Sequence, residues 1–255
     1  MIIAITAQKG GTGKTTTAAT MAAGLTLKGY KVLLIDLDQQ GSLSFICKAD
    51  ATGKTTLGIL TREITAEEAI QPVEIADIIP ANKALAGAEA VLKETGGEYR
   101  LKEALEPING KYDFIIIDCP PALGSLTINA LTAADKVIVP AQADVLSLAG
   151  ITQLYDSCKL VKKYTNKELE IAGILLAKHS NRTVLKRDLE EVLREQLSQQ
   201  MQSKVYTATI REAVAINEAQ YMQQSLFSYA GNSKVAEDYR AFIEEFLQDI
   251  KVKRG

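Results

Sequence analysis

The 255-residue sequence is poor in the residues that build metal sites and disulfide frameworks. Its three cysteines, Cys47, Cys119 and Cys158, are odd in number and lack the close spacing of metal ligands. This cysteine usage favours a reduced, cytosolic setting. The sequence contains one histidine, His179, which argues against a histidine-rich metal or catalytic site.

Long apolar runs are also missing. The opening run MIIAITA is too short for a signal peptide and lacks the charged leading region of one. No other stretch reaches the roughly 18 uninterrupted apolar residues that cross a membrane. The sequence has no low-complexity linker and no long-period repeat, so we expect a single domain over residues 1–255.

The overall charge does not mark a nucleic-acid binder, because the formal net charge is −2. The charges are nevertheless unevenly spread. Of the 29 Lys and Arg residues 16 follow Gly150, whereas only 14 of the 31 Asp and Glu residues do. The C-terminal part is therefore mildly basic on an acidic whole.

Apolar, β-rich runs alternate along the chain with helix-length segments. The runs expected as strands are 2–6, 31–36, 114–118, 136–140 and 171–177, with 77–82 as a further candidate. The segments expected as helices are 14–28, 122–134, 146–164, 183–199 and 233–250. Continuously apolar strands are typical of a parallel sheet covered on both faces. The order predicts an α/β fold, a doubly wound and mostly parallel sheet with helices on both faces.

The segment KGGTGKTT, directly after the first expected strand, is close to a phosphate-binding loop. Gly13, Lys14 and Thr15 fit the end of the general pattern, but Gln8 stands where its first glycine belongs. The glycines let successive N–H groups face phosphate oxygens, and the following helix adds its positive end. Lys14 is expected to reach the β- and γ-phosphates, and the Thr15 hydroxyl to bind Mg²⁺.

The tetrapeptide GKTT occurs a second time, at residues 53–56. No apolar strand precedes this copy, and the position five residues before Gly53 holds Lys48 instead of glycine. We interpret it as a surface turn that leads into a helix, not as a second phosphate-binding loop.

Three aspartates follow apolar strands. LLIDLDQQGS ends the second expected strand with Asp36 and Asp38, whose spacing of two predicts side chains on one face. FIIIDCPP ends the third with Asp118, a Walker-B-type position. Carboxylates at the C-terminal edge of a parallel sheet, beside a phosphate-binding loop, suit Mg²⁺ and the attacking water. The combination predicts nucleotide hydrolysis.

These segments resemble the ParA/MinD superfamily of P-loop ATPases. KGGTGKTT resembles its deviant Walker A motif, and LLIDLDQQGS its DxDPQG motif with Gln39 in place of the proline. DFIIIDCPPALGSLTINAL looks like the Walker B and switch II segment of ParA/Soj partition proteins, and VIVPAQADVLSLAG and LLAKHSNRT resemble later segments more loosely. The similarity covers almost the whole chain.

The resemblance implies a homodimer that sandwiches ATP, in which Lys9 reaches across the interface to the nucleotide of the partner. It also implies that Asp38 positions the lytic water, that Asp36 and Asp118 surround Mg²⁺, and that Gly10 permits close packing at the interface. Hydrolysis in the family is slow and is stimulated by a partner, often a ParB-like DNA-binding protein.

The site predicted in this way has three parts. The catalytic residues are Lys9, Lys14 and Asp38. The ATP-binding residues are Lys9, Gly10, Gly11, Thr12, Gly13, Lys14, Thr15 and Thr16. The Mg²⁺ residues are Thr15, Asp36 and Asp118.

ParA members bind non-specific DNA, whereas MinD members bind membranes through a basic amphipathic C-terminal helix. Here AFIEEFLQDI carries acidic residues on its polar face, which favours a core helix and no membrane contact, although the basic KVKRG follows. We therefore expect DNA binding and a cytoplasmic, nucleoid-associated protein. The candidate phosphate contacts are Lys159, Lys162, Lys163, Lys178, Arg182, Lys186, Arg187 and Arg211. TIREAVAINEA lacks the proline and second arginine of the corresponding Soj-like segment, so Arg211 does not align cleanly.

Two other functions remain open from the sequence. One is a MinD-like ATPase that positions cargo on a membrane or a protein scaffold. The other is a metabolic enzyme with the same loop, such as an amide ligase or a nitrogenase-type reductase. The reductase requires a pair of cysteines at the dimer axis, and Cys119, at the end of a strand, has no evident cysteine partner for such a cluster.

Overall fold

The computed structural model describes residues 1–179, 184–197 and 203–252. Its described strands form one sheet in the order β3-β4-β2-β5-β1-β6-β7-β8. The strands are β1 (Ile2–Ile5), β2 (Val32–Asp36), β3 (Gln71–Pro72), β4 (Asp77–Ile79), β5 (Phe114–Asp118), β6 (Lys136–Ala141), β7 (Glu170–His179) and β8 (Ile210–Arg211). All neighbouring pairs are parallel except β3 and β4, which are antiparallel. The predicted α/β fold with a mostly parallel sheet is confirmed.

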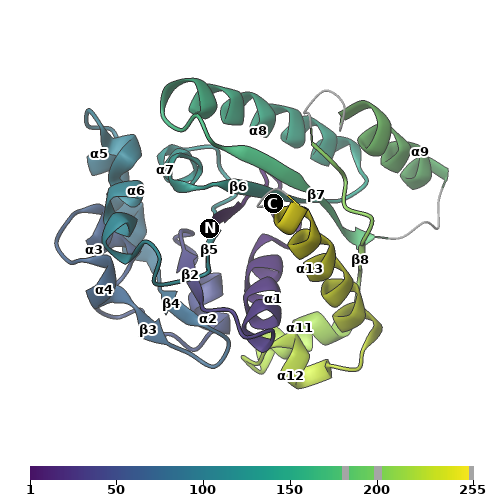
Figure 1. The fold of residues 1–255 in the computed structure, drawn as a ribbon, viewed down its shortest axis with the longest axis horizontal. Coiled ribbons are helices and arrows are strands. Elements are labelled where there is room, and N and C mark those ends of the chain that lie inside the picture. Colours follow the sequence, from purple (N-terminus) through teal and green to yellow (C-terminus); the bar gives the residue numbers. More distant parts are fainter. Residues whose placement is uncertain (180–183, 198–202, 253–255) are drawn as a thin grey trace.

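Helices cover both faces of this sheet (Figure 1). The helices are α1 (Lys14–Leu27), α2 (Ser42–Ile46), α3 (Thr56–Leu60), α4 (Ala66–Ala69), α5 (Ala88–Leu92), α6 (Arg100–Leu105), α7 (Ser125–Ala133), α8 (Val145–Tyr164), α9 (Val184–Val192), α11 (Val214–Tyr221), α12 (Leu226–Ala230) and α13 (Lys234–Val252). Each predicted strand and helix is present, with ends shifted by a few residues. Of the predicted helix 183–199, the described residues form α9 followed by a π-helical turn at Leu193–Leu197, and residues 183, 198 and 199 lie outside the described residues.

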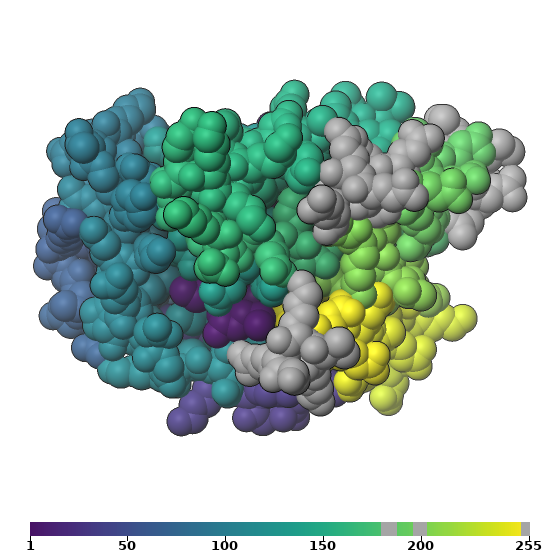
Figure 2. Space-filling view, turned by 45° about the horizontal axis from the view of Figure 1, so that its top comes forward, coloured from purple at the N-terminus to yellow at the C-terminus, as the bar shows by residue number. Residues whose placement is uncertain are grey.

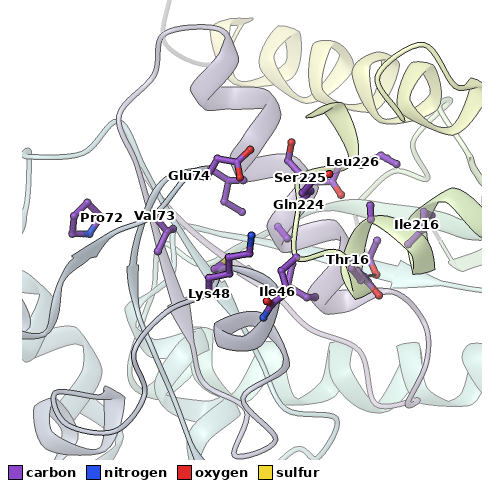
Figure 3. A pocket seen from close by; sticks show the side chains of 17 residues that line it. Thr16, Ile46, Lys48, Pro72, Val73, Glu74, Ile216, Gln224, Ser225 and Leu226 are labelled. Carbon is purple, nitrogen blue, oxygen red and sulfur yellow. Dashed lines mark hydrogen bonds between the residues drawn. The ribbon is translucent and has the colours of Figure 1, made fainter. Parts of the chain in front are cut away.

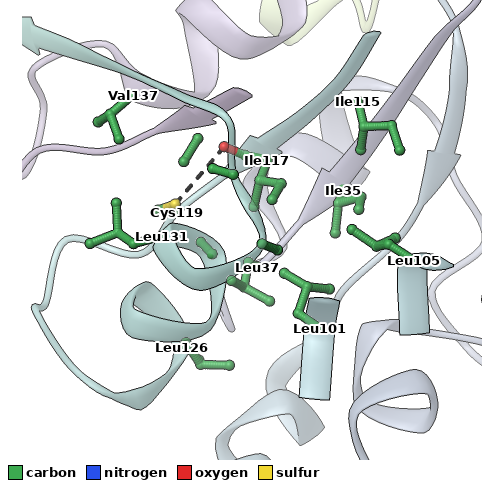
Figure 4. Packing of buried hydrophobic residues seen from close by; sticks show 14 of the residues in the cluster. Ile35, Leu37, Leu101, Leu105, Ile115, Ile117, Cys119, Leu126, Leu131 and Val137 are labelled. Atoms are coloured by element: carbon green, nitrogen blue, oxygen red, sulfur yellow. Dashed lines mark hydrogen bonds between the residues drawn. The ribbon is translucent and has the colours of Figure 1, made fainter. Parts of the chain in front are cut away.

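The doubly wound core follows from the side-chain alternation of buried strands. In β5, Ile115 and Ile117 face the layer of α3 to α8, while Ile116 faces α1 and α13. Figure 4 shows the first layer, in which leucines of α6 and α7 pack against β2 and β5. Figure 2 shows α8, in green, at the surface of the same side of the molecule. Because both faces are covered, the central strands are apolar throughout.

Helix α1 packs against the sheet and against α2, α12 and α13, and for this reason it is buried on nearly all sides. Gly24 permits this close approach, because a Cβ there would lie 2.3 Å from Cδ1 of Ile243. The apolar face of α13, which includes Phe242 and Phe246, is fully buried in this core. The prediction of a core-packing C-terminal helix is therefore confirmed. Within the described residues, no helix combines the length and the apolar character that crossing a membrane requires.

The short elements were not predicted from the sequence. Helices α2 to α6 have four to six residues each, too few to show a helical period. The edge strands β3 and β8 consist of two residues each. The candidate strand 77–82 exists as β4 but ends at Ile79, just before Pro80. These elements bring the residues that follow β4 and β8 to the carboxyl end of the sheet.

Candidate functional site

The loop between β1 and α1 has the geometry of an anion-binding loop. Gly11 and Gly13 have φ angles of +72° and +93°, which side chains other than glycine rarely adopt. Helix α1 begins at Lys14, and no side chain caps its N-terminus. The first N–H groups of the helix are therefore available to a ligand, and the helix dipole favours a negative one.

A cavity of about 410 Å³ opens at this loop. Its lining includes Gly10, Gly11, Thr12, Gly13, Lys14, Thr15, Thr16, Asp38, Ser42, Ile46, Pro121, Ala177, Lys178, Ile210, Arg211, Glu212, Ala213, Ile216, Asn217, Gln220 and Tyr239. The volume is in the range of cofactor pockets. The loop glycines and Lys14 thus line this cavity together with residues of the segment from β8 to α11.

Lys14 extends from the start of α1 into a nearly buried environment. Burial lowers the pKa of its ammonium group, while the charges of Asp118, Asp38 and Cys119 oppose this change. Its Nζ atom lies 3.5 Å from the carbonyl oxygen of Lys9. Lys14 therefore places a positive charge beside two of the three predicted aspartates.

Lys9 lies in a different environment. It does not line the cavity, and its Nζ donates a hydrogen bond of 2.7 Å to Oδ2 of Asp144. Asp144 also caps α8, because its Oδ1 accepts the N–H of Ser147 at 2.9 Å. Both side chains of the Lys9–Asp144 pair are 32% exposed, so the pair is open to solvent and not locked in the core.

Strand β2 ends at Asp36, and Asp38 follows two residues later. Leu37, between them, packs in the same buried cluster as Leu33 and Ile35, which agrees with the predicted shared face of Asp36 and Asp38. Asp38 lies in the following loop, lines the cavity and accepts the N–H of Gln40 at 3.0 Å. Asp36 is fully buried, and burial raises its pKa to about 6, against the hydrogen bonds it accepts from Ser44.

Asp118 pairs with Asp36 across the β2–β5 ladder, and it is equally buried. Neither of its carboxylate oxygens has a hydrogen-bond partner within the described residues. Burial, followed by the charge of Asp36, raises the pKa of Asp118 well above its ordinary range, and Thr15 and Lys14 oppose the rise. An orphaned buried carboxylate beside a hydroxyl is the arrangement that a divalent cation satisfies.

Within the described residues, no group of three His, Cys, Asp and Glu side chains could hold a metal by itself. Carboxylates therefore cannot complete a coordination shell without other oxygen ligands. This is the usual situation for Mg²⁺, which keeps several waters and takes ligands from substrate phosphates. Asp118 and Thr15 fit such a partial shell, and Asp36 lies beside them with oxygens that already accept hydrogen bonds.

A second, smaller cavity of about 170 Å³ adjoins the first (Figure 3). Thr16, Ile46, Ile216 and Gln220 line both cavities. Two of these shared residues are bonded to each other, because Nε2 of Gln220 donates a hydrogen bond of 2.8 Å to the Thr16 hydroxyl oxygen. Helix α11 is therefore tied to the start of α1.

The described candidate DNA-contact residues belong to α8, β7 and β8. Lys159, Lys162 and Lys163 are exposed on the last turns of α8, where cations also stabilise the helix end. Arg211 forms a two-pronged ion pair with Asp238, with both N–O distances 2.7 Å, so its charge is compensated. Arg182 lies outside the described residues, as do the side chains of Lys186 and Arg187 on α9, and Lys178 lines the nucleotide-sized cavity.

Sequence reasoning missed Asp144, Ser44 and Thr56, all of which contact predicted site residues. The only signal for Asp144 was its position directly before a helical segment, which is common for any helix cap. The contacts of Ser44 and Thr56 depend on the short helices α2 and α3, which the sequence did not predict.

Comparison with known proteins agrees with this geometry. Residues 1–171 match the family model described as an AAA domain. The chain is 42% identical over 250 residues to the sporulation initiation inhibitor protein Soj of Bacillus subtilis, covering 96% of this chain and 97% of that protein. It is 36% identical over 252 residues to the chromosome partitioning protein ParA of Myxococcus xanthus, covering 97% and 88%.

A solved structure of similar fold is the cobyrinic acid a,c-diamide synthase from Mycobacterium smegmatis with bound ADP and magnesium. It superposes with a TM-score of 0.83 at 35% sequence identity, and the match covers 98% of this chain and 95% of that one. The matched family model and the near-complete similarity to Soj and ParA lead to one conclusion: the chain belongs to the ParA/MinD family of P-loop ATPases.

Proposed function

We propose that the protein is an ATP-dependent dimerising switch that binds DNA non-specifically in its ATP state and drives DNA partitioning. In this proposal it hydrolyses Mg-ATP slowly, and a ParB-like DNA-binding protein stimulates the reaction. The observation that carries the proposal is the different placement of the two loop lysines. Lys14 lines the nucleotide-sized cavity, whereas Lys9 points away from it toward Asp144.

Within one protomer, the loop glycines and the start of α1 would hold the phosphates through backbone N–H groups. Lys14 would contact the β- and γ-phosphates with its buried ammonium group. Thr15, Asp118 and Asp36 would hold Mg²⁺, which when bound neutralises phosphate charge. The fit of this cation rests on the orphaned oxygens of Asp118.

Asp38 is the proposed residue for the lytic water. It lines the cavity and is partly exposed, so a water molecule can reach its carboxylate. Its Oδ1 accepts the N–H of Gln40 within the same loop, which orients the group. A carboxylate held in this way positions and polarises an attacking water, as phosphoryl transfer requires.

Lys9 cannot serve the phosphates of its own protomer while it is paired with Asp144. The pair is solvent-accessible, and exposed ion pairs contribute only about 0–1 kcal/mol to stability. Exchanging Asp144 for a phosphate therefore costs Lys9 little free energy. In the proposed sandwich dimer, Lys9 leaves Asp144 and contacts the nucleotide of the partner subunit. A long side chain with a compact charge suits this reach.

Two alternatives are less well supported. A MinD-like membrane role needs a free amphipathic helix, but the apolar face of α13 is buried in the core. The synthase name of the Mycobacterium smegmatis structure suggests an amide ligase, but the 42% identity to Soj over nearly both whole chains favours partitioning. DNA binding would place the protein on the nucleoid, with the exposed lysines of α8 as one contact region.

Asp118→Asn is predicted to raise the melting temperature of the nucleotide-free protein at pH 8, by about 2–4 °C for each kcal/mol gained. The folded-state pKa of Asp118 is raised, so folding loses stability as pH rises above the ordinary carboxyl value. The gain should shrink toward pH 4. Asp36 and Asp38, which repel this carboxylate, and Lys14, which attracts it, remain in the variant.

The same variant should lose most of the Mg²⁺-dependent part of the stabilisation by ADP in thermal denaturation. The exposed Asp156→Asn on α8 is the matched control and should change neither measurement. A wild-type protein that is more stable than Asp118→Asn at pH 8 without nucleotide would contradict the assignment.

Lys9→Ala is predicted to retain ATP binding but to lose ATP-dependent dimerisation, because its ammonium group lies outside the protomer's own cavity. Lys14→Ala, a loss of the same charge from the same loop, should instead abolish ATP binding. Calorimetry measures the first property and light scattering the second. A Lys9→Ala dimer as stable as the wild type would rule out a role for this lysine in the partner's site.

ATP-dependent association with DNA is the direct test of the proposed function. Sedimentation with linear DNA should require ATP and should weaken steeply with salt, because phosphate contacts release counterions. Replacing Lys159, Lys162 and Lys163 together with glutamine should reduce DNA binding and leave ATP-dependent dimerisation intact. ATP-dependent sedimentation with anionic liposomes, and none with DNA, would favour the MinD-like alternative.

A further inference from the structure

The second GKTT segment, at residues 53–56, is not a simple surface turn. Gly53 and Lys54 are exposed as predicted, and α3 begins at Thr56. Thr56, however, is fully buried. Its hydroxyl donates a hydrogen bond of 2.7 Å to the backbone carbonyl of Asp36 and lies 3.1 Å from the carbonyl of Pro80. The last residue of this segment therefore contacts a predicted Mg²⁺ residue.

A second buried hydroxyl holds the other end of Asp36. Ser44, on α2, donates to Oδ2 of Asp36 from both its N–H, at 2.9 Å, and its hydroxyl, at 2.7 Å. The Ser44 hydroxyl oxygen accepts the N–H of Ala81 at 2.8 Å. Because a hydroxyl has one hydrogen, this arrangement directs it to the carboxylate of Asp36.

The two contacts come from two different short helices. Ser44 belongs to α2, Thr56 begins α3, and both also bond to the backbone directly after β4, at Pro80 and Ala81. Asp36 is thus fixed by its carboxylate on one side and by its carbonyl on the other. Two hydroxyls whose residues are 2% and 0% exposed have no competing contact with water.

The loop between Asp36 and α2 contacts the same backbone. Gly41 has a φ angle of +63°, and a Cβ at this position would lie 2.9 Å from the carbonyl oxygen of Ala81. A displacement of the loop that carries Asp38 would therefore move the backbone at Ala81. The N–H of Ala81 donates a hydrogen bond to the Ser44 hydroxyl oxygen. The contacts connect the loop, α2 and Asp36 into one unit.

We propose that Ser44 and Thr56 are positioning residues, a hydroxyl clamp that orients Asp36 for the Mg²⁺ shell and couples it to α2 and to the segment after β4. The inference rests on the proposed function, because it takes Asp36 as part of that shell. Groups that orient metal ligands are worth about 10–100-fold in metal affinity.

The test uses Ser44→Ala and Thr56→Val, the second of which keeps the shape of the side chain. The readout is the Mg²⁺ concentration that gives half of the Mg²⁺-dependent rise in melting temperature of the ADP-bound protein. We expect this concentration to increase about 10-fold or more in each variant. ADP affinity measured in EDTA should stay within about two-fold of the wild type, because phosphate contacts of the loop are intact.

Restoring the hydroxyl should restore the metal response. Thr56→Ser and Ser44→Thr should lie closer to the wild-type Mg²⁺ midpoint than the variants that lack the hydroxyl. Thr61→Ala is the matched control, because Thr61 follows the last residue of α3 and its hydroxyl donates a hydrogen bond of 3.3 Å to the carbonyl of Gly58 and none to Asp36.

A purely structural role would lower the melting temperature of Ser44→Ala and Thr56→Val while leaving the Mg²⁺ midpoint unchanged, and that result would overturn the clamp. An equal loss of ADP affinity with and without Mg²⁺ would overturn it as well. If the wild-type protein itself shows no Mg²⁺-dependent stabilisation with ADP, the proposed Mg²⁺-dependent function is contradicted. The clamp, which rests on that function, is then contradicted as well.

Discussion

The site depends on a cluster of buried charge at the carboxyl ends of β2 and β5. Asp36 and Asp118 lie side by side without access to solvent, and the only nearby cation is Lys14 among the residues that the structure describes. Two buried carboxylates against one ammonium leave the cluster under-compensated, which costs folding free energy. A divalent cation with phosphate oxygens would remove that cost, so the protein would be most stable when its nucleotide is bound. The raised pKa values of Asp36 and Asp118 are a consequence of this buried charge. So is the lack of hydrogen-bond partners for the Asp118 carboxylate oxygens within the described residues.

The two lysines of KGGTGKTT differ through burial and position. Lys14 starts α1 and enters the cavity, where burial strengthens every electrostatic contact it makes. Lys9 precedes the glycines, so its side chain leaves on the other side and pairs with the N-cap of α8. A lysine held by a weak, exposed ion pair can change partners at little cost. We infer that Lys14 serves ATP binding and Lys9 serves dimerisation. One loop with both lysines can thereby couple nucleotide binding to dimerisation.

The sequence predicted those parts of the fold and site that depend on one local pattern. Continuous apolar runs gave the central strands, and the ends of those strands placed Asp36 and Asp118 at one edge of the sheet. The spacing of Asp36 and Asp38 predicted a shared face, and Leu37 between them packs with Leu33 and Ile35 in the cluster on the opposite face. Asp144 could not be predicted, since its partner Lys9 lies far away in the chain, and the contacts of Ser44 and Thr56 depend on the short helices α2 and α3. Five-residue helices have no period to detect, and the hydroxyl clamp is built on two of them.

The central claim is that Lys9 acts on the nucleotide of the neighbouring protomer, and mixing two inactive variants tests it most directly. In a dimer of Lys9→Ala with Lys14→Ala, the site on the first protomer keeps its own Lys14 and receives Lys9 from its partner. The account predicts that mixing the two variants raises ATP hydrolysis clearly above the rate of either variant alone, because each mixed dimer holds one intact site. If Lys9 acted within its own protomer, no site in the mixture would be complete. The mixture would then stay as inactive as either variant alone, which would contradict the account.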